Sequence, residues 1–223
     1  MSPPLARPIP RFMSDTPQEA RPYGEWQQRL VAAFSAACDS LAKEAGASLD
    51  PDSVRFFPER TWGARTYVPI VGEAAEVSGL PEFFGYVHFE RGTDGEPGEP
   101  SADADFTDVT ADDNPDWQVD LNDAVIGPWR ADGGRGGEVT LIWGSPLVRG
   151  AVAATAEAGG EVLDQTAIND GRFSLIAVDA IHGFGDDLYL DVKLWDRRLN
   201  ELATESLYES DEGDEEPEEA EKP

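Results

Sequence analysis

Residues 188–195, which read LYLDVKLW, decide the fold class of this 223-residue chain. Leucine or valine occupies every second position, and tyrosine, aspartate, lysine and tryptophan occupy the positions between them. Successive side chains of a β-strand point to opposite faces of its sheet. The alternation therefore predicts a half-buried strand.

The same two-residue period marks the C-terminal part of the chain from Glu138 onward. It predicts strands over residues 139–143, 148–157, 172–179, 188–195 and 201–208. The triplet Asn169-Asp170-Gly171 is typical of a hairpin turn. Because no helical pattern interrupts these segments, we expect antiparallel pairing in a β-sandwich-like region.

A helical period appears only near the N-terminus, between Glu25 and Gly46. Apolar residues recur there at helical spacing: Trp26, Leu30, Phe34, Cys38 and Leu41. Gly46 supplies a stop signal. The pattern predicts one long amphipathic helix whose apolar stripe lies on a sheet. Cys38 belongs to that stripe, so we interpret it as a small core residue rather than a nucleophile.

Shorter strand patterns follow the helix, over residues 53–57, 65–71 and 83–90. In the last of them both alternating sets are apolar or aromatic, which predicts a central strand covered on both faces. Residues 91–105 are rich in glycine, proline and acids and read as the longest internal loop. Residues 106–129 mix aspartates with apolar residues and fit no single period.

These patterns predict an α+β fold that is mostly antiparallel β, with one long N-terminal amphipathic helix packed on a sheet and a C-terminal β-sandwich-like region. Four parts are expected along the chain: a flexible proline-rich arm (1–22), a helix plus β-rich region (23–135), the β-sandwich-like region (138–208) and a disordered acidic tail (209–223). The two central regions are either separate domains or share one sheet system.

Residues 146–194 resemble a known class of module. They read Pro-Leu-Val-Arg-Gly-Ala-Val from Pro146, then Asn-Asp-Gly-Arg-Phe-Ser-Leu from Asn169, then the strand ending at Leu194. This order resembles the prealbumin-like (carboxypeptidase-regulatory-like) β-sandwich modules. Those modules are generally non-catalytic, so the resemblance implies a binding or scaffolding role and transfers no site residues.

The charge of the chain limits the kinds of partner it can bind. Its formal net charge is −28, with 45 acidic and 17 basic residues. Phosphate backbones are bound through lysine and arginine, so we expect no direct nucleic-acid binding and no membrane binding. Another protein, in particular a basic one, is the expected partner. No intrachain disulfide can form with Cys38 as the single cysteine, which favours the cytoplasm.

One acidic segment has the spacing of a calcium loop. Asp112, Asn114, Asp116, Asp120 and Asp123 occupy positions 1, 3, 5, 9 and 12 of a twelve-residue window, as EF-hand ligands do. Position 6, where the EF-hand turn requires glycine, is Trp117, and no suitable helix precedes the window. The spacing predicts a possible Ca²⁺ site, with a solvated acidic loop as the alternative.

Two further groups are candidates for binding. His182 lies in a glycine-rich segment with Asp186 and Asp187, which could present a base or a metal ligand or could simply form a hairpin tip. Trp117 lies next to aspartate and Trp129 next to proline, with Arg130 following it, and tryptophan and arginine often anchor protein interfaces. Ordinary core or turn packing is the alternative for these three residues.

No catalytic signature is present, because the chain lacks a nucleophile elbow and a phosphate-binding loop. The leading hypothesis is a non-enzymatic cytosolic interaction or adaptor module with a strongly acidic surface. The alternative is a carboxylate-based cation-binding protein or enzyme that uses the 112–123 window or the 182–187 loop.

Overall fold

The computed structural model describes residues 22–75, 81–130, 136–178 and 190–207. In these ranges the chain forms one long helix, α1 (Gly24–Ala45), and a short 3₁₀ helix, η1 (Pro51–Ser53). The strands are β1 (Arg55–Phe56), β2 (Arg60–Trp62), β3 (Arg65–Glu73), β4 (Glu82–Glu90), β5 (Ser101–Thr107), β6 (Val119–Arg130), β7 (Gly136–Pro146), β8 (Ala153–Ala158), β9 (Glu161–Ala167), β10 (Phe173–Val178), β11 (Leu190–Trp195) and β12 (Glu201–Ser206). The α+β fold, with its N-terminal helix and antiparallel strands, is confirmed.

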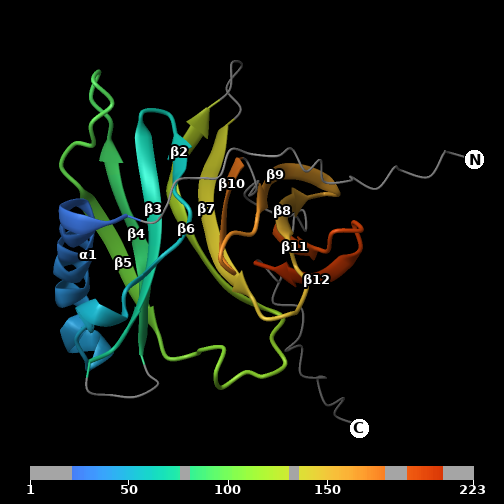
Figure 1. Ribbon diagram of the computed structural model, residues 1–223, viewed down its shortest axis with the longest axis horizontal. Helices are drawn as coiled ribbons and strands as arrows, with labels where there is room; N and C mark the ends of the chain where they lie inside the picture. Colours follow the sequence, from blue (N-terminus) through green and yellow to red (C-terminus); the bar gives the residue numbers. More distant parts are fainter. Residues whose placement is uncertain (1–21, 76–80, 131–135, 179–189, 208–223) are drawn as a thin grey trace, which may run out of the picture.

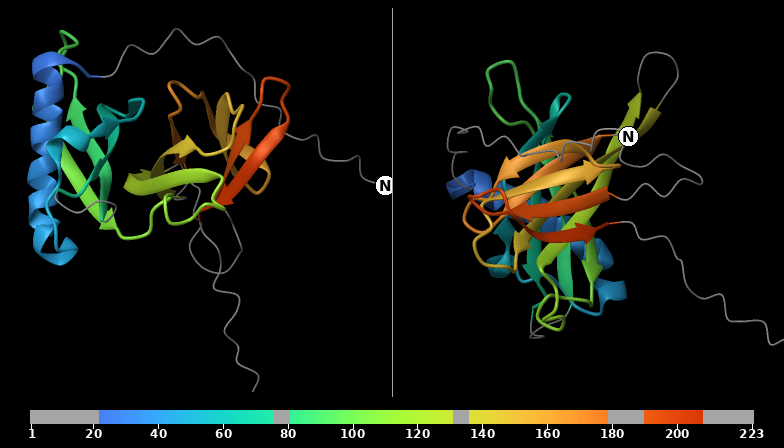
Figure 2. Two further views of the ribbon diagram at one scale, coloured as in Figure 1. Left: turned by 60° about the horizontal axis from the view of Figure 1, so that its bottom comes forward. Right: turned by 90° about the vertical axis from the view of Figure 1, so that its right-hand side faces the viewer.

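The described strands form three antiparallel sheets stacked behind α1 (Figure 1). The helix-covered sheet has the order β1-β3-β4-β5, with β2 also paired to β3. The middle sheet has the order β10-β7-β6, and the outer sheet has the order β12-β11-β8-β9. Figure 2 shows α1 on one side of the stack and the outer sheet on the other.

Helix α1 packs through the predicted stripe. Leu30, Phe34 and Cys38 are fully buried against apolar side chains of β3, β4 and β5. Each large apolar side chain buried in this way stabilises the fold by about 1.5–3 kcal/mol. Gly46 ends the helix in the left-handed conformation, with φ of 70°. Burial raises the pKa of the Cys38 thiol to about 12, in keeping with a core residue.

The two faces of β4 enter two different cores, which confirms a central strand covered on both faces. Phe83, Val87 and Phe89 pack under α1. Phe84 and Tyr86 point the other way, into a second core shared with the middle sheet. In that core β7 contributes Val139, Leu141 and Trp143, all fully buried.

A third core lies between the middle and outer sheets. Phe173, Leu175 and Ala177 of β10 meet Leu190, Val192 and Leu194 of β11 there, all six of them fully buried. The alternation in residues 190–195 is therefore the inward-facing pattern that was predicted. The C-terminal part of the chain is a sandwich of two antiparallel sheets.

The turn at residues 169–171 links the two sheets of this sandwich. Asp170 and Gly171 both have positive φ, as the Asn-Asp-Gly signal predicts. The strands on either side of the turn separate, because β9 pairs with β8 while β10 pairs with β7. Asp164 of β9 accepts a hydrogen bond from the Ile176 N–H of β10 at 2.8 Å. The carboxylate therefore fastens the edge of the middle sheet to the outer sheet.

Four strands lie where no strand was expected: β2, β5, β6 and β9. The expectation of a loop through residue 105 is wrong in its last part, because β5 begins at Ser101. β6 pairs with β7 along its length. The middle sheet therefore contains residues from both sides of the boundary expected at 135–138.

Helix α1 carries too many polar and charged residues to cross a membrane, and no other described helix could do so.

Candidate functional site

The structure does not bring all five residues of the 112–123 window together around one point, although the charge of Asp112 acts on Asp120. Asp112 lies in a turn in which the Asp113 N–H donates to the Thr110 carbonyl. The Asn114 side chain is engaged locally, because its Nδ2 donates to the same carbonyl at 2.8 Å. Asp116 lies in the next turn and is exposed. The first half of the window therefore forms successive turns.

The second half of the window is extended and belongs to β6. Asp120 is opposite Ser145 and faces the helix-covered sheet, whereas Asp123 is opposite Ile142 and faces the outer sheet. Because they point to opposite faces, these two side chains cannot bind the same ion. Among the described residues, no three His, Cys, Asp or Glu side chains are grouped so that they could hold a metal.

Asp120 instead belongs to an acidic cluster between the helix-covered and middle sheets. Its neighbours are Glu82 of β4 and Arg55 of β1. Arg55 Nη2 lies 2.9 Å from Glu82 Oε2, and the Glu82 side chain is only 16% exposed. Glu73 adds further negative charge, because it is directly opposite Glu82 on β3.

The acids of this cluster outnumber its cations, and this changes their proton affinity. Burial, reinforced by the negative charge of Asp120, raises the pKa of Glu82 to about 7, although Arg55 opposes the shift. Burial also raises the pKa of Asp120, against the opposing effect of Arg55. The cluster can therefore hold a proton near neutral pH, as a general acid does.

A second polar surface lies on β4 and β5, on the face that looks toward the middle sheet. Ser101, Asp103 and Asp105 are exposed there, and the strand register places Ser101 beside His88 and Asp103 beside Tyr86. We call these five residues the acidic shelf. Because paired residues point to the same face, the shelf combines two exposed carboxylates with an aromatic and an imidazole ring.

Within the acidic shelf, Asp103 interacts with both rings. His88 Nε2 lies 3.8 Å from Asp103 Oδ2. Burial and the Arg65 charge lower the pKa of His88, against a smaller opposing effect of Asp103. Burial, the charge of Asp103 and a hydrogen bond to Asp103 raise the pKa of the Tyr86 hydroxyl. At neutral pH the shelf is therefore a negatively charged surface with a neutral aromatic base.

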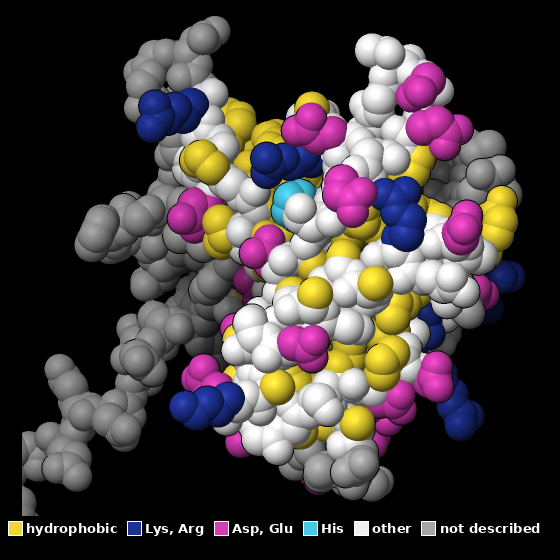
Figure 3. All heavy atoms as spheres, turned by 90° about the vertical axis from the view of Figure 1, so that its left-hand side faces the viewer, with side chains coloured by type: hydrophobic (Ala, Val, Ile, Leu, Met, Phe, Trp, Pro, Cys, Tyr) yellow, Lys and Arg dark blue, Asp and Glu magenta, His cyan; other side chains and the backbone are white. Residues whose placement is uncertain are grey.

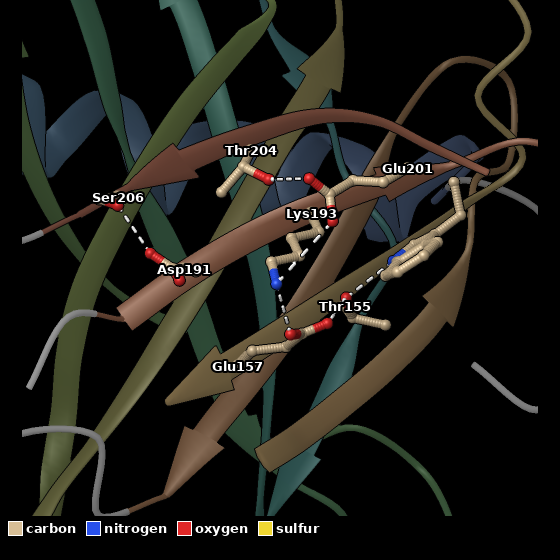
Figure 4. Close-up of polar contacts among 8 residues, drawn as sticks. Thr155, Glu157, Asp191, Lys193, Glu201, Thr204 and Ser206 are labelled. Atoms are coloured by element: carbon tan, nitrogen blue, oxygen red, sulfur yellow. Dashed lines mark hydrogen bonds and ion pairs between the residues drawn. The ribbon is translucent and has the colours of Figure 1, made fainter. Parts of the chain in front are cut away.

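A third polar cluster lies on the face of the outer sheet that points away from the third core (Figure 4). Lys193 Nζ of β11 donates to Glu157 Oε2 of β8 at 2.8 Å, and Thr155 Oγ1 donates to Glu157 Oε1 at 2.9 Å. Trp195 Nε1 in turn donates to Thr155 Oγ1 at 2.9 Å. Glu201 Oε2 lies 3.9 Å from Lys193 Nζ.

This network is internally satisfied. Burial would lower the pKa of Lys193, but its hydrogen bond to Glu157 and the charges of Glu157 and Glu201 outweigh that effect and raise it. Lys193 therefore stays charged beside Glu157, which is 2% exposed. An ion pair of this kind holds two strands together, and it offers neither a free base nor a nucleophile.

The remaining candidates from the sequence are not grouped. Trp117 is 37% exposed in the segment before β6. Trp129 packs partly buried against the core between the helix-covered and middle sheets, and Arg130 is exposed at the end of β6. His182, Asp186 and Asp187 lie outside the described residues.

The sequence interpretation missed Glu82, Arg55 and the acidic shelf. A signal for the shelf was present, because Ser101, Asp103 and Asp105 alternate with Ala102, Ala104 and Phe106 as in a half-buried strand. Its aspartates made the segment resemble a loop. No comparable signal exists for the cluster of Arg55, Glu82 and Asp120, whose members come from three strands of two sheets.

Comparisons with known proteins returned no family model, no curated protein and no solved structure that matches this chain. The resemblance of residues 146–194 to prealbumin-like modules therefore stays a prediction from the sequence.

Proposed function

We propose that this protein is a non-enzymatic interaction module of the cytoplasm that binds a basic segment of another protein through the acidic shelf. The observation that carries the proposal is the exposure of Asp103 and Asp105 on a rigid strand, beside the rings of Tyr86 and His88. Exposed carboxylates attract lysine and arginine, and the partly exposed ring of His88 adds a flat surface on which a guanidinium group can stack.

The charge of the whole chain supports a basic partner. With a net charge of −28, the protein attracts cationic segments over several ångströms and repels nucleic acids and anionic membranes. On the face shown in Figure 3, acidic and basic side chains are interspersed, with hydrophobic side chains between them. A binding or scaffolding role also agrees with the resemblance to prealbumin-like modules.

The proposal is tested by binding of fluorescein-labelled hepta-lysine and hepta-glutamate peptides to the full chain, measured by fluorescence anisotropy. We expect binding of the lysine peptide only, weakening as salt rises because surface charges are screened. Asp103→Asn combined with Asp105→Asn should lower the affinity for the lysine peptide about fivefold to tenfold, since two charge pairs are lost.

The matched control, Asp39→Asn with Glu44→Gln on the exposed side of α1, removes the same charge elsewhere. Equal loss in both variants would contradict the shelf as the binding surface.

A different observation favours a second candidate function, a carboxylate-based cation-binding protein or enzyme. Glu82 and Asp120 are two acids with raised pKa beside one arginine, an arrangement that acid catalysts and cation sites also use. Thermal melts with Ca²⁺, Mg²⁺, Mn²⁺ and Zn²⁺ at constant ionic strength test the cation-binding form. A melting temperature that rises with one ion, and no longer rises in the Glu82→Gln variant, would support it. No ion-specific rise would contradict it.

A further inference from the structure

The middle sheet ends one strand earlier than the helix-covered sheet beneath it. β4 and β6 are in contact, so β6 lies over β4. β5 is the next strand outward in the helix-covered sheet, and its residues on that face, Ser101, Asp103 and Asp105, are exposed. No described strand pairs with β6 on the side away from β7. The position beside β6 and over the acidic shelf is therefore free of described strands.

The backbone of β6 is arranged to accept a strand at this position. The Gln118 carbonyl accepts from the Leu147 N–H at 2.9 Å, which places Gln118 among the residues bonded to β7. Antiparallel residues alternate between bonding to the neighbouring strand and pointing away from it. The backbone groups of Val119, Leu121 and Val125 therefore point away from β7, toward the outer edge of the sheet.

We propose that a basic, extended segment of a partner protein adds to β6 as the fourth strand of the middle sheet, over the acidic shelf. This inference rests on the proposed function and specifies its geometry. Stacked sheets lie about 10 Å apart, a gap that lysine and arginine side chains can reach across. Alternate residues of a strand are about 7 Å apart, the same spacing as Asp103 and Asp105, so alternate basic residues match the shelf.

Two features of β6 limit the length and kind of segment. The strand has a bulge between Val125 and Gly127 and a proline at 128, which end the regular edge. Regular pairing is thus confined to the stretch from Val119 to Val125, which equals the seven-residue β5 in length. A second copy of this chain is disfavoured as the occupant, because each copy carries a net charge of −28.

The test uses a labelled peptide, Lys-Val-Lys-Val-Lys-Val-Lys, and two isomers methylated on backbone nitrogen. One isomer carries the methyl groups on its three valines. The other carries them on three lysines, namely the two inner ones and the C-terminal one. The N–H groups of valine and lysine point to opposite edges of an extended peptide. If the peptide adds to β6, one isomer should lose affinity at least about tenfold and the other should stay within about threefold of the parent.

The outcomes separate this inference from the proposed function. Equal binding by the parent and both isomers would overturn strand addition and leave the shelf as a surface bound through charge alone. Loss of binding by both isomers would also overturn pairing along a single edge. Failure of every lysine-containing peptide to bind at low salt would contradict the proposed function itself.

Two further measurements identify the occupant. Sedimentation should show a monomer with and without the peptide. A dimer that persists in the presence of the peptide would overturn the proposal, because a second copy of the chain would then occupy the edge of β6. Combined Arg7→Ala and Arg11→Ala should leave the peptide affinity unchanged. A rise in affinity would show that the chain's own N-terminal residues compete for the edge, which would overturn a partner as the occupant.

Discussion

A buried and a partly buried glutamate of this protein, Glu157 and Glu82, have different electrostatic surroundings. Glu157 in the outer sheet accepts hydrogen bonds from the Lys193 ammonium and from a threonine hydroxyl, and the second acid near Lys193, Glu201, has a side chain that is 44% exposed. Glu82 between the helix-covered and middle sheets also contacts one cation, Arg55, but Asp120 adds a second negative charge. The comparison teaches that two acids around one cation form a structural ion pair when one of the acids is exposed, and bind a proton more tightly when both are partly buried.

Removal of the Lys193 ammonium should cause the largest loss of unfolding free energy among the changes considered for these two sites. Lys193→Met leaves Glu157 charged and 2% exposed without its counter-ion. Breaking a buried pair in this way costs about 3–5 kcal/mol of unfolding free energy. Chemical denaturation at pH 7 measures the loss. Glu157→Gln is the matched variant, and it should cost less, about 1–3 kcal/mol, because Lys193 can still turn toward Glu201 or solvent. Equal losses would contradict the assignment of Glu157 as the more deeply buried partner.

The site at Glu82 should respond in the opposite direction. The pKa of Glu82 is raised from 4.5 to about 7, so the native state binds a proton more tightly than the unfolded state does. The stability from this proton is complete below about pH 4.5 and is lost as the pH rises through about 7. Glu82→Gln should therefore stabilise the protein by about 1–3 kcal/mol at pH 8 and flatten its stability between pH 5 and 8.

The control for this prediction is Glu90→Gln, at the other end of the same strand. Glu90 is exposed and changes the net charge of the protein by the same amount. Denaturation curves of both variants should be collected at several pH values. A pH dependence in Glu82→Gln that equals that of the control would contradict a proton held at Glu82.

The influence of Asp120 on Glu82 can be measured separately. Asp120→Asn removes the acid whose charge most affects Glu82 and should lower the pKa of Glu82, because Asp120 raises it in the native protein. The ¹³C chemical shift of the Glu82 side-chain carboxyl, followed by NMR through a pH titration, reports this change directly. An unchanged midpoint would show that burial alone sets the pKa of Glu82, and the two acids would then titrate independently.

The sequence predicted those parts of the fold that have a clear hydrophobic period. Leu30, Phe34 and Cys38 are spaced for a helix, and Leu190, Val192 and Leu194 for a strand, because each set faces a single core. β5 and β6 escaped prediction for a physical reason. Their non-core positions include Asp103, Asp105 and Asp120, and acidic residues are as common in loops as on the solvent side of a strand.

The candidate sites were harder to predict than the fold, because each depends on strand register. Glu82, Arg55 and Asp120 meet only after β1, β4 and β6 are stacked in two sheets. The spacing of Asp112, Asn114, Asp116, Asp120 and Asp123 suggested a calcium loop, but half of that window is an extended strand. A local pattern identifies ligand-type residues, and it does not show which of them point to the same side.

The smallest expected effect concerns the hydrogen bond from Trp195 to Thr155, which does not involve Glu157 directly. Trp195→Phe removes the Nε1–H that donates to Thr155, while Thr155 can still donate to Glu157. We expect a loss of about 0.5–1.5 kcal/mol of unfolding free energy, the usual contribution of one such bond. A double-mutant cycle with Glu157→Gln then measures whether Trp195, Thr155 and Glu157 act together. A coupling energy above about 0.5 kcal/mol would show that the indole orients the hydroxyl for the carboxylate. Strict additivity would mean that the indole does not act on Glu157 through Thr155, and that Lys193 alone neutralises the carboxylate.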